Sequence, residues 1–255
     1  MNFTVFDNFP KTRQELPPEF MAIYESHYKK NRQGETKATS LSMKMERWLH
    51  AKVAGDVQTE AGSRLSTLEI GAGMLNQLPF EPSVLNYDIV EPFKELYHGS
   101  DYLSRVRRVY ANINEIPAGM RYDRITSIAT FEHILNLPEV VAKAVTLLEK
   151  SGSLRVSIPN EGTILWKLGT LVTGYEFKRL YGLNYQVLMK YEHVNTADEI
   201  EAVLKYFFHS AATNVFGINK KLAFYRFINC TGPDFDKAVE YLERSESRTK
   251  GASLQ

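Results

Sequence analysis

The sequence predicts an α/β fold of the Rossmann-like type, in which helices surround a mostly parallel β-sheet. From residue 65 onward, short apolar stretches alternate with segments of helical periodicity, which is typical of parallel strands joined by right-handed crossovers. The first apolar stretch runs into a glycine pair, Gly71 and Gly73, as a strand followed by a sharp turn would. Near the carboxyl end, two apolar stretches are separated by only Asn219-Lys220-Lys221, which is too short for a crossover and requires an antiparallel hairpin.

Residues 1–64 are predicted to form an amino-terminal helical lid or extension. Pro17 and Pro18 can begin a helix that runs to about Lys30. A second helix is indicated by apolar residues at helical spacing: Leu41, Met45, Trp48, Leu49 and Val53. Whether these helices form a lid, the contact of a homodimer, or both stays open at this point.

Residues 65–244 are predicted to form the main domain. Its parallel strands are expected at 65–70, 84–90, 106–110, 123–129 and 153–159, with a clear helix at 137–150. Residues 161–192 interrupt this alternation with an aromatic and basic stretch, which we interpret as an inserted helical lid over the substrate.

The alternation resumes with a helix at 196–208, where Thr196 and Glu199 have the spacing of a capping box. The hairpin strands follow at 212–218 and 222–228. The polar residues 245–255 are predicted to be a flexible tail.

The glycine pair is predicted to form a ligand site together with an acid on the next strand. Glycine tolerates positive φ and lets the backbone approach a ligand closely. Glu91 closes the second apolar stretch, where a carboxylate can accept hydrogen bonds from both hydroxyls of a ribose. Asn76 stands where a dinucleotide fingerprint would have its third glycine, and Glu69 precedes the pair. A ligand with a cationic amino-acid group and no diphosphate, such as S-adenosyl-L-methionine, fits this loop.

Composition argues against several other classes of function. Thirty-one basic and 30 acidic residues give a formal net charge of +1, so no nucleic-acid partner is expected. The chain has one cysteine and scattered histidines without a His-x-x-x-His spacing, so no metal site is predicted. A secretion signal and an apolar stretch of about 18 residues are both missing, so we expect a cytoplasmic protein without a membrane span.

Over residues 65–230 the chain resembles the class I S-adenosylmethionine-dependent methyltransferases, especially their small-molecule and sugar-modifying members. The resemblance rests on Leu68-Glu69-Ile70-Gly71-Ala72-Gly73, on Glu91, on Ala111 to Pro117, on Thr130-Phe131-Glu132-His133 and on the turn at Ser151-Gly152. It implies a seven-stranded sheet of order 3-2-1-4-5-7-6 with strand 7 antiparallel. It also implies that the cofactor is held by Glu69, Gly71, Ala72, Gly73, Glu91, Pro92, Asn112, Ile113, Thr130 and Phe131. Asn112 stands where this family usually places an acid or amide against the adenine amino group.

The resemblance implies methyl transfer to an oxygen, or as second choice a nitrogen, of a small-molecule or saccharide acceptor in polysaccharide or natural-product biosynthesis, with S-adenosyl-L-homocysteine as product. His133 and His193 are the candidate bases. Aromatic residues are expected to bind the acceptor: Tyr28, Trp166, Tyr175, Tyr181 and Tyr185. Two alternatives remain, a noncatalytic cofactor-binding regulator of the same fold and a nicotinamide-dependent Rossmann enzyme.

Overall fold

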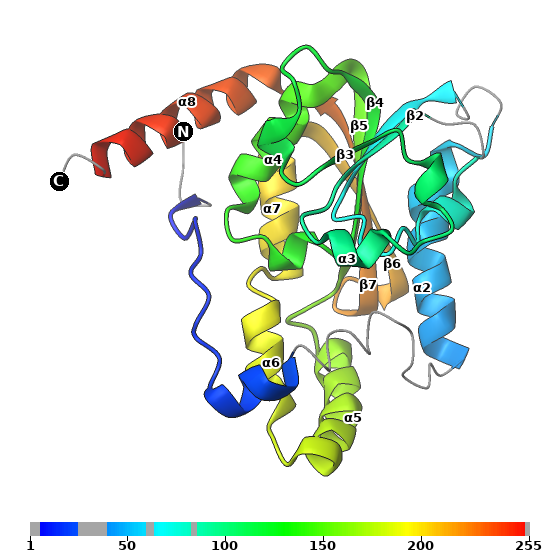
Figure 1. Ribbon diagram of the computed structural model, residues 1–255, viewed down its shortest axis with the longest axis vertical. Helices are drawn as coiled ribbons and strands as arrows, with labels where there is room; N and C mark the ends of the chain where they lie inside the picture. Colours follow the sequence, from blue (N-terminus) through cyan, green and yellow to red (C-terminus); the bar gives the residue numbers. More distant parts are fainter. Residues whose placement is uncertain (1–5, 25–39, 60–63, 83–85, 253–255) are drawn as a thin grey trace.

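A computed structural model of the chain shows one seven-stranded sheet with helices on both faces (Figure 1). The structure describes residues 6–24, 40–59, 64–82 and 86–252. The strand order is β3-β2-β1-β4-β5-β7-β6. The strands are β1 Ser66–Ile70, β2 Asn86–Val90, β3 Arg108–Tyr110, β4 Tyr122–Ile128, β5 Leu148–Pro159, β6 Phe208–Asn219 and β7 Leu222–Pro233. The predicted order is therefore confirmed.

The sheet is parallel from β3 to β5, and β7 runs antiparallel to both of its neighbours. Ile70 pairs with Val90, and Val90 pairs with Tyr110, so the first three strands end side by side. At the far side of this edge Pro159 of β5 pairs with Tyr225 of β7. The carboxyl ends of the parallel strands thus meet the beginning of β7, and ligands of open α/β sheets bind at such an edge.

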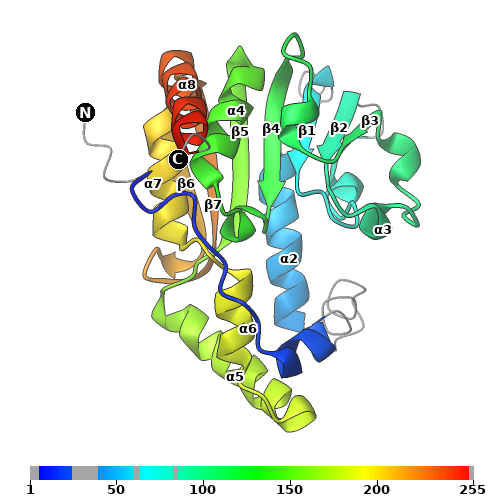
Figure 2. The same ribbon diagram turned by 60° about the vertical axis from the view of Figure 1, so that its left-hand side comes forward.

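Two layers of helices bury the sheet. The helices are α2 Ser40–Val53, α3 Lys94–Tyr97, α4 Leu137–Leu147, α5 Ile164–Tyr181, α6 Tyr185–Glu192, α7 Ala197–Phe207 and α8 Phe235–Ala252. Figures 1 and 2 show α4, α7 and α8 on one face of the sheet and α2 on the other. The main core lies under α4 and α7, whose apolar stripes are fully buried. The predicted capping box of α7 is confirmed, since Thr196 and Glu199 exchange hydrogen bonds.

Buried arginines attach α2 to the sheet. Arg124 of β4 and Arg155 of β5 both donate to the carbonyl oxygen of Val53, at 2.9 and 2.8 Å, and Arg155 also donates to that of Lys52 at 2.8 Å. The last carbonyls of a helix have no partner within the helix and favour cations, so the two guanidinium groups complete the end of α2. Arg124 is fully buried, and its charge is compensated by the Glu81 carboxylate, whose Oε2 lies 2.7 Å from Nη1 of Arg124.

The inserted segment 161–192 is helical, as predicted, and forms α5 and α6 beyond the carboxyl edge of the sheet (Figure 2). A second, smaller core joins these helices to the amino-terminal segment, where residues 18–24 are helical. Its buried members are Leu16, Phe20, Phe177 and Leu188. The helix expected after Pro17 therefore forms, and its further course toward Lys30 lies outside the described residues.

The carboxyl end differs from the prediction. Helix α8 continues to Ala252, so most of the segment 245–255 that was expected to be a flexible tail is helical. The reason is local: Arg244 pairs with Glu240 one turn earlier, and the Ser247 hydroxyl donates to the carbonyl oxygen of Glu243 at 2.9 Å. A polar composition alone did not distinguish a solvated helix from an unstructured tail.

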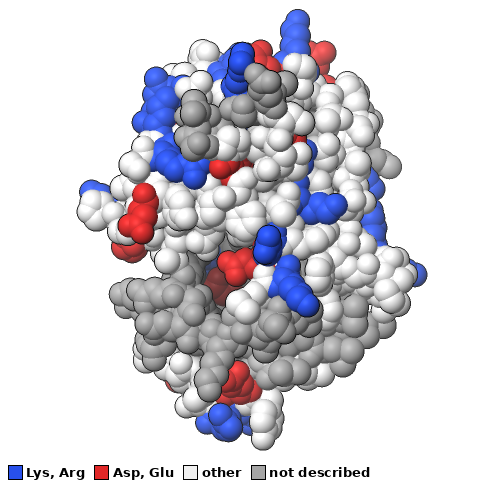
Figure 3. Space-filling model, turned by 90° about the vertical axis from the view of Figure 1, so that its right-hand side faces the viewer, with Lys and Arg blue, Asp and Glu red and all other residues white. Residues whose placement is uncertain are grey.

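The helices and the surface charges bear on the expected absence of membrane and nucleic-acid partners. Among the described residues, none of the helices combines the length and apolar character that crossing a bilayer requires. In Figure 3 the basic side chains are interspersed with acidic ones, and acidic side chains lie within a hollow near the middle of that face.

Candidate active site

The glycine loop follows β1 at the carboxyl edge of the sheet. Gly71 has a φ of +74° and Gly73 a φ of +52°, which side chains rarely tolerate. The amide of Gly71 donates to the carbonyl oxygen of Val90 at 2.8 Å. A Cβ at position 71 would lie 2.3 Å from both Cγ2 and Oγ1 of Thr130. Only glycine therefore allows this loop to pack against the residues that follow β4.

Glu91 begins the loop after β2 and forms a hydrogen bond with the glycine loop. Its side chain is buried, and its two oxygens accept from the amides of Gly73 at 2.8 Å and Phe93 at 3.1 Å. A carboxylate has about four acceptor positions, so these two bonds leave capacity for a ligand's hydroxyl groups. Pro92 and Phe93 follow directly, and the Phe93 side chain is 50% exposed. Phe93 offers an apolar surface beside the acid, which the sequence analysis did not identify.

Glu69 lies on β1 with a buried side chain that accepts from the Tyr87 hydroxyl at 2.8 Å. Burial raises the pKa of Glu69 to about 8, and the Tyr87 hydrogen bond opposes that shift only in part. The acid is thus neutral at pH 7 and belongs to a buried layer with Arg124 and Glu81. Its role toward a cofactor stays a prediction.

The remaining predicted cofactor residues differ in exposure. Asn112 is exposed, and its side-chain oxygen accepts from the Asn114 amide at 2.9 Å, which caps a short 3₁₀ turn. Ala72, Ile113 and Phe131 are buried. The Thr130 hydroxyl donates to the carbonyl oxygen of Ile128 at 3.1 Å. Asn112 and Thr130 can therefore present backbone or side-chain groups at the edge, whereas Phe131 packs its ring in the core.

The two candidate bases come together. His133 lies in the turn after β4 and His193 follows α6, and their rings meet edge to face with centroids 4.8 Å apart. Backbone hydrogen bonds fix the two segments, since the carbonyl oxygen of Glu132 accepts from the amides of Val194 at 2.8 Å and Asn195 at 3.1 Å. The Asn195 side chain adds bonds to the carbonyl oxygens of Phe131 at 2.8 Å and Ile134 at 2.7 Å.

Acidic side chains surround the two imidazoles. His193 Nδ1 contacts the Glu161 carboxylate, and His133 Nδ1 lies 2.8 Å from the carbonyl oxygen of Glu192. Burial lowers the pKa of His193, but the Glu161 hydrogen bond and the charges of Glu132, Glu161 and Glu192 outweigh burial, so the net shift is upward. Burial raises the pKa of Glu132, and the two histidines oppose that shift.

Aromatic rings form a wall beside this cluster. Trp166 stacks near His193 with centroids 6.1 Å apart, and Tyr225 meets Trp166 edge to face at 6.1 Å. Burial, followed by the charges of nearby acids, raises the pKa of both Tyr185 and Tyr225 to about 12. The charges of Glu192 and Glu161 contribute to the upward pKa shift of Tyr185, and those of Glu132 and Glu46 contribute to that of Tyr225.

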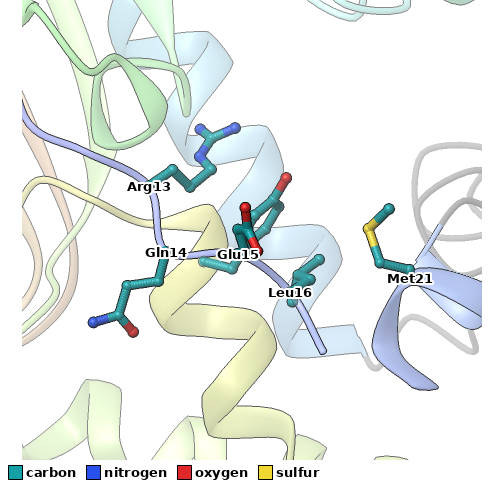
Figure 4. A pocket seen from close by; sticks show the side chains of 6 residues that line it. Arg13, Gln14, Glu15, Leu16 and Met21 are labelled. Atoms are coloured by element: carbon teal, nitrogen blue, oxygen red, sulfur yellow. The ribbon is translucent and has the colours of Figure 1, made fainter. Parts of the chain in front are cut away.

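The amino-terminal segment closes one side of this region. Arg13 donates to the carbonyl oxygen of His133 at 3.0 Å, and its guanidinium lies 5.1 Å from the centre of the Tyr191 ring. Lys11 donates to the carbonyl oxygen of Val194 at 2.7 Å. A cavity of about 370 Å³ adjoins these contacts, lined by Arg13, Gln14, Glu15, Leu16, Met21 and Tyr191 (Figure 4).

Comparison with known proteins identifies the fold. No family model matches the chain, and no curated protein matches its sequence. Solved structures do match. A methyltransferase of Thermotoga maritima, described as a possible histamine N-methyltransferase, is 14% identical with a TM-score of 0.52, over 84% of this chain and 98% of that one. A plantazolicin methyltransferase in complex with S-adenosylhomocysteine is 14% identical with a TM-score of 0.57, over 84% and 93%. The 1,6-didemethyltoxoflavin N1-methyltransferase of Burkholderia thailandensis is 13% identical with a TM-score of 0.52, over 88% and 93%.

The chain has the class I methyltransferase fold. At these identities the likeness shows the fold alone. The fold does confirm the resemblance on which the positions of the glycine loop, Glu91 and His133 were predicted.

Within this fold, the predicted acceptor residues have different environments. Trp166 lies beside His193, whereas Tyr185 packs on Phe177 with ring centroids 5.3 Å apart, in the core of the lid. Tyr181 packs on Phe177 at 4.9 Å between ring centroids, inside the core of the lid, and Tyr175 is 75% exposed. Tyr28 lies outside the described residues. Tyr225 was missed, because a tyrosine within a strand gives no signal of a site until the register of β7 against β5 places it opposite Pro159.

Proposed function

We propose that this protein is an S-adenosylmethionine-dependent methyltransferase that acts on a hydroxyl group of a small molecule. The observation that carries the proposal is the buried Glu91 carboxylate, held against the Gly73 amide at the carboxyl edge of the sheet. An acid in this position suits a ribose, and the adjoining glycine loop has no room for a side chain at Gly71.

The residues at this edge fit S-adenosylmethionine better than a dinucleotide. Gly71 and Gly73 present backbone at positive φ, and Asn76 takes the place of the third glycine that close packing over a pyrophosphate favours. Phe93 supplies an apolar surface beside Glu91 for a purine ring. Bound S-adenosylmethionine would supply a methyl group on a sulfonium, which is already activated for displacement.

The protein's own contribution is alignment of the acceptor and removal of its proton. Glu161 holds Nδ1 of His193, which leaves the lone pair of Nε2 to accept a proton. A hydroxyl acceptor needs this kind of group, whereas an amine needs only to be neutral, and we therefore favour oxygen over nitrogen. Trp166 and the amino-terminal segment would exclude water from the reacting atoms.

The acceptor class is inferred from the lining of the site. Trp166 offers a ring face beside His193, and Tyr225 packs edge to face against Trp166, a pairing of aromatic rings that suits a polyhydroxylated ring such as a sugar. The saccharide acceptor, a biosynthetic role, the homodimer and a cytoplasmic location stay predictions.

A screen of acceptors tests the proposal. Purified protein is incubated with S-adenosylmethionine and sets of sugars, nucleotide-linked sugars, phenols and amines, and release of S-adenosylhomocysteine is followed by chromatography. We expect turnover with a hydroxyl compound, and we expect His193→Ala to slow it while the exposed control His209→Ala does not. Turnover with amines alone would refute oxygen transfer, and silence across all sets in a protein that binds the cofactor would favour the noncatalytic regulator.

A further inference from the structure

Three side chains at the carboxyl edge form a group with the composition of a metal site. Glu132, His133 and His193, which we call the Glu-His-His cluster, each offer a ligand atom, and these atoms lie within 4.8 Å of one another. Two of them come from the turn after β4 and one from the segment after α6. The histidine spacing in the sequence gave no sign of this cluster, because the fold and not a local motif brings the residues together.

The hydrogen bonds of the histidines orient both rings for ligation. His133 Nδ1 lies 2.8 Å from the carbonyl oxygen of Glu192, an acceptor, so Nδ1 carries the proton and Nε2 the lone pair. His193 Nδ1 contacts the Glu161 carboxylate, which requires a proton on Nδ1 in the same way. Histidines that bind metals almost always donate their other ring N–H to a carbonyl or carboxylate oxygen. Both rings have this arrangement.

The third member has an unsatisfied oxygen. The Glu132 side chain is 2% exposed, and its Oε2 is buried without a hydrogen-bond partner. Its other oxygen lies 3.8 Å from Nε2 of His133. A buried carboxylate oxygen without a hydrogen-bond partner destabilises the folded state. A cation between Glu132 and the two imidazoles would give Oε2 of Glu132 a partner.

We propose that the Glu-His-His cluster binds one divalent transition-metal ion, with Nε2 of His133, Nε2 of His193 and the Glu132 carboxylate as ligands. Two imidazoles and one carboxylate suit an ion such as Zn²⁺, Co²⁺ or Fe²⁺, whereas Mg²⁺ and Ca²⁺ prefer oxygen ligands. Ligands about 2.1 Å from a tetrahedral ion lie roughly 3.4 Å apart, so binding draws the three side chains closer by rotation about their side-chain bonds.

The ion has a role in the chemistry that rests on the proposed function. Three protein ligands leave a coordination position for the acceptor's hydroxyl, whose pKa the ion lowers. With the ion bound, Nε2 of His193 is a ligand and the ion takes over from it the activation of the acceptor. The hydroxyl proton leaves to water, the oxygen's electron pair forms the new bond to the methyl carbon, and the carbon–sulfur bond breaks with its pair on sulfur. Metal binding itself does not depend on this role.

Metal binding to the full-length, tag-free protein tests the inference. After treatment with a chelator and its removal, the protein is titrated with Co²⁺ by absorbance and with Zn²⁺ by calorimetry. We expect one ion per chain, and loss of binding in His133→Ala, His193→Ala and the shape-matched Glu132→Gln. Glu161→Gln keeps all three ligands and should weaken binding about 10–100-fold. His209→Ala, at an exposed position on β6, should bind as the wild type does.

Circular dichroism confirms that each variant is folded before it is compared. Absence of stoichiometric binding in the wild type, or binding that survives in Glu132→Gln and both histidine variants, would overturn the inference. Titration of the same samples with S-adenosylhomocysteine separates the two proposals. Metal binding without binding of S-adenosylhomocysteine would support the metal site and refute the methyltransferase proposal. Binding of S-adenosylhomocysteine without metal binding would refute the metal site and leave the methyltransferase proposal standing.

Discussion

Replacement of Gly71 by alanine tests whether the glycine loop depends on its packing against Thr130. Two costs add at this position. An alanine at a φ of +74° is strained by about 1–2 kcal/mol. Its Cβ would also lie 2.3 Å from Thr130 Cγ2 and 2.8 Å from Thr130 Cβ. Thr130 is β-branched and stiff, so the backbone must shift, which typically costs about 1–3 kcal/mol more. We therefore expect Gly71→Ala to lower the free energy of unfolding by about 2–5 kcal/mol.

The chain supplies a matched control at Gly182, after α5. Its φ is +72°, and a Cβ built there has nothing within 4 Å, so Gly182→Ala carries the strain without the clash. Urea unfolding should show a loss of only about 1–2 kcal/mol for Gly182→Ala. Calorimetry should show weaker S-adenosylhomocysteine binding for Gly71→Ala alone. Equal losses of stability in the two variants, with unchanged affinity, would refute the packing argument.

Three further predictions concern buried polar groups. Arg124→Met should lower the free energy of unfolding by about 3–5 kcal/mol, because it leaves Glu81 buried without its cation; chemical denaturation that shows less than about 1 kcal/mol would contradict this. The pKa of Glu69 rises from 4.5 to about 8 in the folded state, so between these pH values the folded protein binds more protons than the unfolded chain. The free energy of unfolding therefore falls as the pH rises from 4.5 to about 8. Glu69→Gln removes this dependence on pH. Its free energy of unfolding should exceed that of the wild type by about 2–4 kcal/mol at pH 8 but not at pH 4.5, as measured by urea unfolding at both pH values. Asn195→Ala should cost about 1–3 kcal/mol and slow methyl transfer, since it releases the segment that carries His193; full activity with lowered stability would limit Asn195 to a structural role.

The closing hairpin and the edge of the site were predictable because they rest on strong local signals, whereas the full strand order was implied by the family resemblance. A link as short as that between β6 and β7 permits only a hairpin, and the glycine loop and Glu91 end consecutive strands. Parallel strands place such ends at one edge whatever the details of packing. The family resemblance placed His133 at this edge, but its contact with His193 was not predicted.

The surroundings of the histidines were not predictable in the same way. Helical spacing of tyrosines does not tell whether they face a pocket or a neighbouring helix, and Tyr181 turned out to pack within the lid. The position of Tyr225 depends on the register of β7 against β5. The contact of Glu161 with His193 depends on the course of the chain after β5. These are tertiary properties that one sequence read alone does not contain.

Calorimetric titration shows whether Glu91 and the glycine loop hold S-adenosylmethionine. Wild-type protein, Glu91→Ala and the exposed control Glu95→Ala are each titrated with S-adenosylmethionine, S-adenosylhomocysteine and NAD. We expect the wild type to bind both sulfur ligands and not NAD, Glu91→Ala to bind the sulfur ligands more weakly by about 1–3 kcal/mol, and Glu95→Ala to bind as the wild type does. Binding of NAD instead, or equal affinity of Glu91→Ala and the wild type for S-adenosylhomocysteine, would contradict this expectation.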